Sequence, residues 1–216
     1  MKRETRRIID DLLAATPALA ECEPDIRSAY ELLRGCFTDA GKLLICGNGG
    51  SACDSSHIAG ELMKGFQLRR QIPADHTAML KSAFPGRGKA IADSLQRALP
   101  ALSLPDQTSV MTAFSNDVAA DMAFAQMVYG LGRPGDAFLG ISTSGSARSV
   151  VHAAMTARAM GLYTIGLTGH DGGELGGVCD VAIRVPSRET YRVQEYHVCV
   201  YHALCAMLEY EFFAEA

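Results

Sequence analysis

A histidine and a carboxylate lie one helical turn apart just after a glycine-rich segment. The stretch LLICGNGGSACDSSHIAGEL, residues 43–62, leads from an apolar run through this segment to His57 and Glu61. Residues four apart share one face of a helix. Such a pair can hold a divalent metal or place a carboxylate base beside a substrate, although most isolated pairs are solvated polar faces. The apolar flanks favour a functional role, because a buried Glu and His need partners.

The last apolar segment, TYRVQEYHVCVYHALCAML at residues 190–208, carries a second polar set. On a helix, Gln194 and His202 lie roughly 80° apart, whereas His197 lies roughly 140° from His202. At most one of these histidines therefore shares a site with Gln194. We expect His202 to be the functional one and His197 to be structural or at the surface.

Two turns have the composition of an anion site. In residues 47–51, GNGGS, three glycines let the backbone approach a ligand closely. In residues 142–146, STSGS, hydroxyl groups crowd the start of a helix, where the helix dipole and free amides favour an anion. Turn formation and N-capping explain either segment alone. Two such turns at strand ends of one sheet indicate a phosphate monoester site.

A dinucleotide site is the main alternative for the first turn. Gly47, Gly49 and Ala52 fit the pattern G-x-G-x-x-G/A. That fingerprint also needs an acidic residue at the end of the next strand, and the segment GFQLRRQIPAD at residues 65–75 is not strand-like. The phosphate-loop pattern G-x-x-x-x-G-K-[ST] does not occur either. Neither nucleotide motif is supported.

The elements that must position these residues alternate along the chain. Apolar runs predict buried strands at residues 42–46, 136–142, 163–169 and 180–186, with a short strand at 101–104, and helical segments separate them. Long helices are expected at residues 4–36, as one or two helices, and at 189–213. This alternation predicts a parallel sheet covered by helices on both faces.

The chain is predicted to be one domain, residues 1–216, that contains an insertion. Residues 67–99 carry two prolines and many charges, and we expect two short helices there, at 75–83 and 89–99. Asn116 and Asp117 follow at a junction between a helix and a loop, where alone they would be an ordinary cap or turn.

Composition excludes several classes of protein. Hydrophobic residues make up 48% of the 216 residues and charged residues 20%, as in globular proteins. The net charge of −4 gives no global basic face, so a nucleic-acid partner is not expected. No apolar run approaches the roughly 18 residues that span a bilayer, and the charged start MKRETRRIIDDLL is not a signal peptide. We expect a cytoplasmic protein without a membrane partner.

Four segments in order carry a family resemblance: CGNGGSACDSSHIAGEL, SNDVAADMAFAQMVYGLGRPGDAFLGISTSGSARSVVHAA, GLTGHDGGELGGVCDVAIRVPS and VQEYHVCVYHALCAMLE. Together they resemble the sugar isomerase (SIS) domain family, specifically its phosphoheptose isomerase branch. The resemblance implies a three-layer αβα sandwich with a central parallel sheet, the flavodoxin-like SIS fold. It also implies a homotetramer whose active sites lie at subunit interfaces and bind a phosphosugar.

The resemblance implies three sets of site residues. Glu61 and His202 would be the acid–base pair. One zinc ion per subunit would have the ligands His57, Glu61, Gln194 and His202. The phosphosugar would be bound by Asn48, Gly49, Gly50, Ser51, Asn116, Asp117, Ser142, Thr143, Ser144 and Gln194.

The implied reaction converts sedoheptulose 7-phosphate to D-glycero-manno-heptose 7-phosphate through a cis-enediol. Glu61 would remove the proton from the carbon next to the carbonyl, and His202 would move the proton between the oxygens. Zinc bound to both residues would compete with these roles, and the sequence leaves open which state works.

Departures from the family pattern leave two alternatives for function. Ala147 stands where a phosphate-binding Ser or Thr is usual, so that Ser146 or Ser149 would have to substitute, and Gly65 stands where an Arg is common. These changes and the insertion allow isomerisation of a different ketose phosphate. The other alternative is a non-catalytic protein of this fold that binds a partner protein, such as a replication initiator, or senses a phosphosugar. The retained polar set argues against it.

Overall fold

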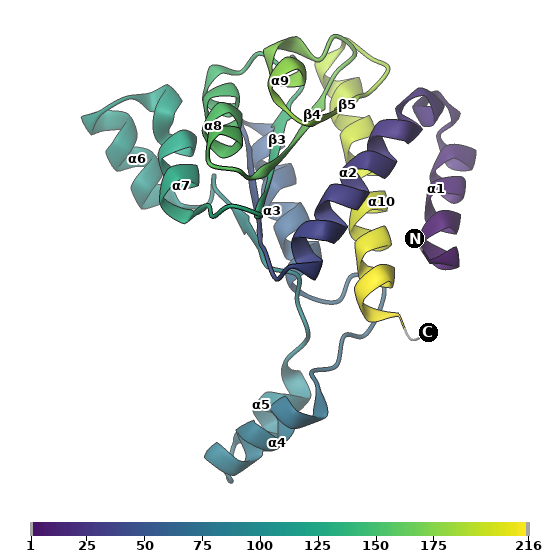
Figure 1. Cartoon of the computed structure of the whole chain (residues 1–216), viewed down its shortest axis with the longest axis vertical. Coiled ribbons are helices and arrows are strands. Elements are labelled where there is room, and N and C mark those ends of the chain that lie inside the picture. The colour runs from purple at the N-terminus through teal and green to yellow at the C-terminus, as the bar shows by residue number, and fades with distance from the viewer. Residues whose placement is uncertain (1, 215–216) are drawn as a thin grey trace.

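A five-stranded parallel sheet forms the centre of the computed structural model, which describes residues 2–214 (Figure 1). The strand order is β2-β1-β3-β4-β5, and every neighbouring pair is parallel. The strands are β1 (Leu43–Gly47), β2 (Ala101–Ser103), β3 (Ala137–Ser142), β4 (Tyr163–Thr168) and β5 (Val181–Arg184). The predicted strand positions and the parallel sheet are confirmed.

Helices cover both faces of the sheet, which confirms the three-layer arrangement. One face is covered by α1 (Arg3–Ala15), α2 (Glu23–Thr38), α3 (Gly50–Met63) and α10 (Thr190–Phe213). The other face is covered by α6 (Thr108–Asp117), α7 (Ala123–Leu131), α8 (Arg148–Ala159) and α9 (Gly173–Val178). Short 3-10 turns at Pro17–Cys22 and Ala120–Met122 complete these layers. No helix within the described residues combines the length and hydrophobicity needed to cross a membrane.

Alternation along the strands divides the apolar core in two. Leu43 and Ile45 of β1 face the layer that contains α3 and α10, whereas Leu44 and Cys46 face the layer that contains α7 and α8. All of β1 and β3 is buried. A strand buried on both faces must be apolar at successive positions, which explains the continuous apolar runs in the sequence.

The strand order places a switch point between β1 and β3. From β1 the chain first adds β2 on one side and then crosses back to add β3 on the other. Ligands of open α/β sheets bind at the carboxyl ends of the strands that flank such a point. Gly47 at the end of β1 pairs with Ile141 near the end of β3, so the two turns predicted to bind an anion begin side by side.

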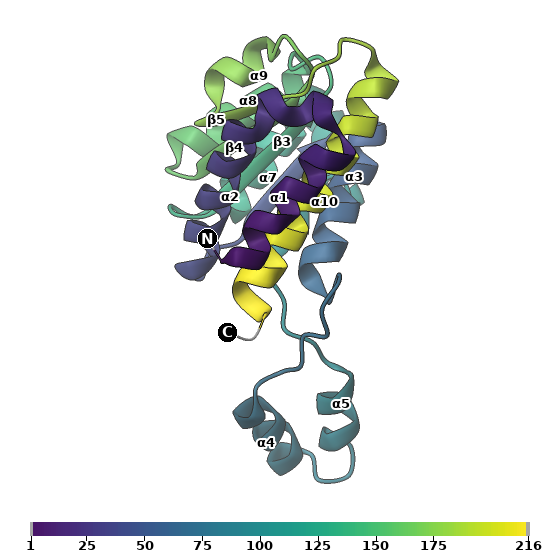
Figure 2. The same ribbon diagram turned by 90° about the vertical axis from the view of Figure 1, so that its right-hand side faces the viewer.

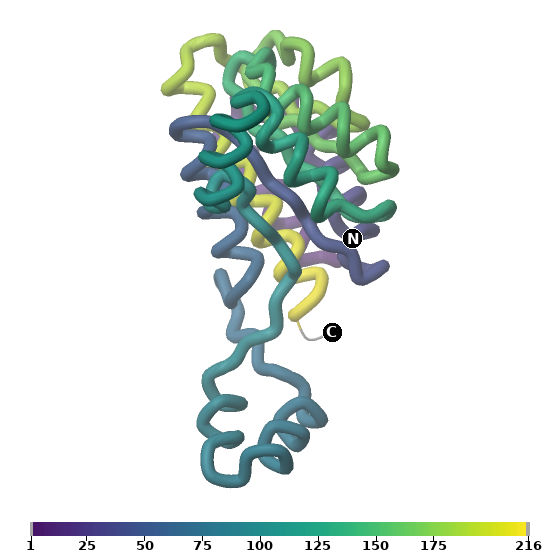
Figure 3. The backbone as a smooth tube through the Cα atoms, turned by 90° about the vertical axis from the view of Figure 1, so that its left-hand side faces the viewer, coloured from purple at the N-terminus to yellow at the C-terminus, as the bar shows by residue number. Residues whose placement is uncertain are grey.

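The segment between α3 and β2 projects from the body as a helical hairpin. It contains α4 (Ala74–Ala83) and α5 (Gly88–Ser94), and the chain segments that lead to and from it run together (Figures 2 and 3). The predicted helix at residues 89–99 is wrong beyond Ser94. The residues after it bond back to the end of α3 and the start of the hairpin instead of continuing the helix: Gln96 accepts the N–H of Gly65, Arg97 donates its N–H to Arg70, and Leu99 donates its N–H to Leu62.

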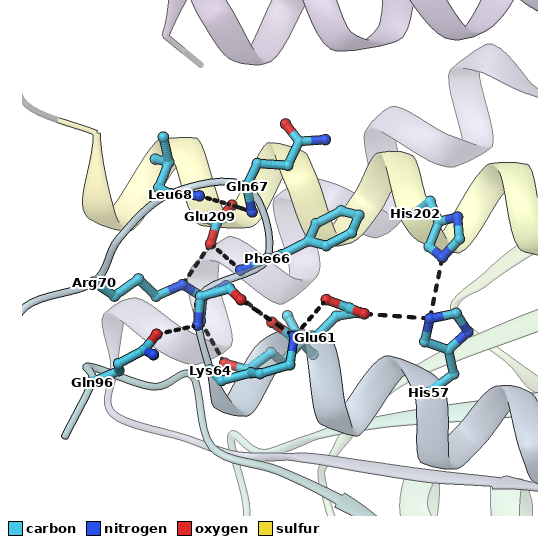
Figure 4. A network of polar contacts seen from close by, with 12 residues as sticks. His57, Glu61, Lys64, Phe66, Gln67, Leu68, Arg70, Gln96, His202 and Glu209 are labelled. Atoms are coloured by element: carbon cyan, nitrogen blue, oxygen red, sulfur yellow. Dashed lines mark hydrogen bonds and ion pairs between the residues drawn. The ribbon is translucent and has the colours of Figure 1, made fainter. Parts of the chain in front are cut away.

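A buried ion pair ties the end of α3 to α10. Arg70 Nε lies 2.7 Å from Glu209 Oε1, and both side chains are 0% exposed. The guanidinium also donates to the carbonyl oxygens of Glu61 and Leu62 (Figure 4). The Glu209 carboxylate accepts three further bonds, from the backbone N–H groups of Phe66, Gln67 and Leu68. The ion pair therefore forms hydrogen bonds with backbone groups at the end of α3 and in the following loop. These bonds offset the cost of burying the two charges.

Glu209→Gln should lower the free energy of unfolding by about 3–5 kcal/mol, because it leaves the buried Arg70 guanidinium without a counter-charge. Urea denaturation monitored by circular dichroism measures the effect. Glu31→Gln is the matched control, because Glu31 pairs with Arg34 at the surface and should lose less than about 1 kcal/mol. Equal losses for the two variants would contradict a structural role for the buried pair.

Candidate active site

A cavity of about 300 Å³ lies at the switch point of the sheet. The ends of β1 and β3, the helices that follow them and the start of α10 all contribute to it. Its lining residues are Asn48, Gly50, Ser51, Ile141, Ser142, Thr143, Ser144, Ala147, Thr190 and Gln194. The structure thus brings seven residues of the predicted phosphosugar set to one cavity.

The first turn depends on glycine for its shape. Gly49 has φ of +56°, in the left-handed region that side chains disfavour, and it directly precedes α3. Gly50 lies against the side-chain amide of Gln194, so that a Cβ at this position would collide with Nε2. A glycine here lets α10 place an amide group beside the start of α3, where the helix dipole favours an anion.

The second turn is held by a left-handed glycine. Gly145 has φ of +67°, and its N–H donates to the carbonyl oxygen of Ser142 at 3.0 Å. Its own carbonyl accepts the N–H of Leu175 at 2.8 Å, which fixes the turn against the start of α9. A Cβ at Gly145 would overlap the carbonyl of Gly172. This packing presents the hydroxyl-bearing residues to the cavity.

Ala147 lines the cavity at the position where the family pattern has a hydroxyl. Ser149, one of the two substitutes considered from the sequence, accepts a hydrogen bond from Asn48 Nδ2 at 3.0 Å. Ser146 instead bonds to Ser144 within the turn. The Ser149 hydroxyl therefore links the first turn to the start of α8.

A second polar cluster lies farther along α3 and α10 (Figure 4). His57 Nε2 is 3.3 Å from Glu61 Oε1 and 3.5 Å from His202 Nε2. The side chain of His57 is 46% exposed and that of Glu61 only 14%, so the carboxylate is the more deeply buried of the two groups. The helical spacing predicted for His57 and Glu61, and the choice of His202 over His197, both correspond to this arrangement.

Burial and nearby polar groups set the environment of Glu61 and His202 in the cluster. Lys64 Nζ lies 3.3 Å from Glu61 Oε2 and supplies a counter-charge. Burial and the neighbouring His57 lower the pKa of His202. A neutral imidazole is the state that can accept and return a proton.

The predicted zinc ligands divide between the two parts of the site. His57, Glu61 and His202 meet in the cluster, whereas Gln194 lines the cavity. Gln194 and His202 are eight residues apart on α10, which corresponds to about 12 Å of helical rise. Within the described part of the chain, no group of three or more His, Cys, Asp or Glu residues is arranged to hold a metal ion.

Two further predictions have different outcomes. Asn116 and Asp117 end α6, where the Asn116 side chain donates to Asp117 Oδ1 at 2.8 Å. Neither lines the cavity at the switch point, so their contact with substrate stays a prediction. His197 is fully buried, and burial lowers its pKa to about 4, so its ring stays neutral within the core of α10.

Sequence reasoning missed three residues beside the site. Thr190 lines the cavity, and its position at the predicted start of the last helix was an available signal. Asp54 and Tyr201 lie behind His57, where the Tyr201 hydroxyl contacts both Asp54 and the imidazole. Their only signal was proximity in sequence: Tyr201 directly precedes His202, and Asp54 lies three residues before His57.

Known proteins match both the sequence and the fold. Residues 74–169 match the SIS domain family model. The chain is 38% identical to the phosphoheptose isomerase of Roseiflexus sp. over 215 residues, covering 98% of this chain and 96% of that protein, and 38% identical to that of Geotalea daltonii over 90% and 88%. The structure of a phosphoheptose isomerase from Neisseria gonorrhoeae superposes with a TM-score of 0.70 at 33% identity, covering 94% of this chain and 97% of that one.

The fold and the site define a sugar isomerase of the SIS-domain class, an enzyme that interconverts aldose and ketose forms of a phosphosugar. Within that class the identities extend over nearly the whole chain. The chain belongs to the phosphoheptose isomerase family. The predicted resemblance is therefore confirmed, and the non-catalytic alternative loses its support.

Gly145→Ala should lower the free energy of unfolding by about 1–3 kcal/mol, because the left-handed turn becomes strained and the Cβ meets the carbonyl of Gly172. Affinity for a sugar phosphate, measured by calorimetry, should fall as the serine turn shifts. Gly130→Ala near the end of α7 is the control, because a Cβ there meets nothing within 4 Å. Unchanged stability and affinity in Gly145→Ala would show that the turn does not depend on this glycine.

Proposed function

We propose that this protein converts sedoheptulose 7-phosphate to D-glycero-manno-heptose 7-phosphate. The observation that carries the proposal is the pairing of an anion-type cavity at the switch point with a His–Glu–His cluster farther along the same two helices. Curated relatives named phosphoheptose isomerase support the same substrate class.

The cavity suits the phosphate end of the substrate. Ser51 at the start of α3, the turn at residues 142–144 and the Gln194 amide supply hydroxyl and amide donors around it. The start of α3 adds the favourable end of a helix dipole. Holding the phosphate here fixes the reacting carbons against the cluster, and such positioning is worth several kcal/mol of barrier.

The distance between cavity and cluster favours a long sugar. Gln194 lies level with the phosphate cavity and His202 with the cluster, about 12 Å apart in helical rise. The carbonyl of a seven-carbon ketose phosphate lies farther from its phosphate than that of a five-carbon one. An extended heptose phosphate is therefore the better match to this spacing.

Proton transfer is assigned to Glu61 and His202. Glu61 as carboxylate takes the proton from the carbon next to the carbonyl, and the electron pair forms the double bond of a cis-enediol. His202, neutral at the outset, moves the proton between the two oxygens. Return of the carbon-bound proton from Glu61 to the neighbouring carbon completes the isomerisation without an external oxidant or reductant.

Zinc is proposed as a cofactor on the chemistry of the donors. Two imidazole nitrogens and a carboxylate oxygen meet at His57, and lone pairs in such proximity are favourable only around a proton or a cation. His57, Glu61 and His202 would hold the ion after rearranging from their positions in this structure, and Gln194, which lines the cavity here, is the fourth predicted ligand. When bound, the ion would polarise the carbonyl and hydroxyl groups.

We also propose that the protein forms an oligomer, with a tetramer as the expected form. Val118 and Tyr129, beside α6 and α7, are each 67% exposed, and large apolar side chains at the surface suit subunit contacts. Light scattering of the purified protein measures the state directly. The cytoplasmic location expected from the sequence stays a prediction.

Glu61→Gln should reduce turnover by at least about 10³-fold, because an amide cannot accept the carbon-bound proton. Binding of the sugar phosphate, measured by calorimetry, should persist because the phosphate cavity is intact. The control is Glu174→Gln, at the start of α9 and outside both the cavity and the cluster, which should leave turnover unchanged. Turnover by Glu61→Gln at the wild-type rate would refute the assigned base.

A panel of C5, C6 and C7 aldose and ketose phosphates tests the substrate assignment. NMR in deuterium oxide should show interconversion and deuterium uptake with the heptose pair, and much slower exchange with the shorter sugars. Faster exchange with a pentose or hexose phosphate would favour the alternative raised by Ala147, in which the enzyme isomerises a different ketose phosphate. No exchange with any sugar would reject isomerase activity altogether.

A further inference from the structure

The hairpin of α4 and α5 exposes more apolar surface than two short helices can cover by packing on each other. Met79 and Phe84 are 61% and 60% exposed, and Ile91 and Leu95 are exposed as well. α4 buries no residue, and α5 buries only a glycine and an alanine. Helices of ten and seven residues are marginal in water on their own. Apolar side chains gathered on such an element suit contact with another molecule.

The same segment is basic, although the chain as a whole is acidic. Residues 67–99 contain six Lys or Arg and two Asp, a net charge of +4, within a chain of net charge −4, so the other residues carry −8. Near the tip of the hairpin, the side chains of Lys81 and Arg87 form no hydrogen bond or ion pair within the described part of the chain. The tip therefore presents an exposed aromatic side chain, Phe84, flanked in sequence by two unpaired cations.

The turn at the tip has a defined geometry. The N–H of Phe84 donates to the carbonyl oxygen of Leu80 at 3.0 Å, and the Phe84 carbonyl accepts the N–H groups of Arg87 at 3.1 Å and Gly88 at 2.6 Å. A Cβ at Gly88 would overlap the Leu80 carbonyl, so α4 and α5 meet closely here. At the root of the hairpin, an antiparallel bridge joins the entering and leaving segments. Phe84 is therefore held at a fixed place at the end of a fastened element.

A groove of about 440 Å³ beside α6 and α7 has the complementary chemistry. Val110, Phe114 and Val118 give this α6–α7 groove an apolar lining, and Asp117 adds a carboxylate. Asp117 accepts a hydrogen bond from the neutral Asn116 amide, and among the described residues no cation pairs with it. The groove therefore offers apolar surface to an aromatic side chain and an unpaired negative charge to a cation.

The hairpin of a subunit does not reach the groove of the same subunit. It projects beyond one end of the body, whereas α6 lies toward the other end (Figures 1 and 3). Its root is held by the bond from the Arg97 N–H to the Arg70 carbonyl oxygen, so the hairpin does not fold back. A second copy of the chain can supply the groove, because each copy carries one hairpin and one groove.

We propose that the hairpin tip of one subunit docks in the α6–α7 groove of a second copy. Phe84 is the apolar anchor of this contact, and Lys81 or Arg87 pairs with Asp117. In a two-fold pair each subunit gives one hairpin and receives one, so no hairpin or groove is left over. The proposal gives the oligomer proposed above a specific contact, and it does not depend on the isomerase reaction.

Cysteine cross-linking tests the contact directly. A tagged Phe84→Cys subunit is co-expressed with an untagged Val118→Cys subunit, and a gel after mild oxidation should show a disulfide-linked heterodimer. Each variant co-expressed with the wild type controls for the seven native cysteines. Phe84→Cys with Tyr163→Cys is the matched control, because Tyr163 is exposed at the start of β4 and lies outside the groove. Heterodimer only at the level of these controls would overturn the proposal.

Dissociation constants supply the second test. Phe84→Asp and Val118→Asp should each raise the dissociation constant of the oligomer at least about tenfold, because a carboxylate enters an apolar contact. Sedimentation velocity over a dilution series measures this change, and circular dichroism checks that the variants fold. Tyr163→Asp should keep the wild-type value. The wild-type value in both Phe84→Asp and Val118→Asp would overturn the contact, even with the oligomer itself intact.

Salt dependence tests the charged part of the contact. Added salt should weaken the wild-type oligomer, and Arg87→Gln with Lys81→Gln should flatten this dependence because the ion pair is lost. An unchanged salt dependence would overturn the pairing with Asp117. A wild-type protein that stays monomeric at every concentration would refute both this contact and the proposed oligomer. Isomerase activity is assayed separately, so its absence would refute the proposed function and leave these results decisive.

Discussion

The buried pair of Arg70 and Glu209 holds together the two helices on which the site depends. Glu209 lies on α10, seven residues after His202, and Arg70 bonds to the carbonyl oxygens of Glu61 and Leu62 on α3. The carboxylate also gathers the loop that follows α3 through three backbone N–H groups. An ion pair of this kind stabilises a fold only if all its hydrogen bonds are satisfied, and here several of them go to the backbone at the end of α3.

The projecting hairpin is fastened to the body beside the same ion pair. The chain leaves the body after Arg70 and returns at Arg97, whose N–H bonds to the Arg70 carbonyl oxygen. The start and the end of the hairpin are therefore fastened at one point, and α4 has no buried residue of its own.

The fold could be predicted from sequence because its signals are local or periodic. Strands buried on both faces give continuous apolar runs, and their alternation with helices fixes a parallel sheet. The two turns were also predictable, because glycines and serines follow strand ends in the sequence. The structure shows Gly49 and Gly145 with the positive φ that such turns need. The early end of α5 was not, because the hydrogen bonds of residues 96–99 go to residues about 30 positions away.

The site was only partly predictable for the same reason. Spacing placed His57 and Glu61 on one face, and helical angles favoured His202 over His197, which the structure buries. The angles could not show that Gln194 lines the cavity and lies away from the cluster, because an axial separation of about 12 Å does not appear on a helical wheel. The hydrogen bonds among Asp54, Tyr201 and His57 depend on how α3 packs on α10, which no local pattern encodes.

The roles proposed for the cavity and for Glu61 would place a phosphate and a carboxylate at opposite ends of α3, an arrangement that reconciles substrate binding with base catalysis. The cavity at the switch point lies at the start of α3, beside Gly50, and Glu61 lies near the end of that helix. Eleven residues separate the two positions, or about 16 Å of helical rise. Coulomb repulsion falls with distance, so a bound phosphate at this separation would repel the carboxylate far less than one in contact with it. The dipole at the start of the helix can therefore favour the phosphate without acting on the base, because its effect is confined to the first turn.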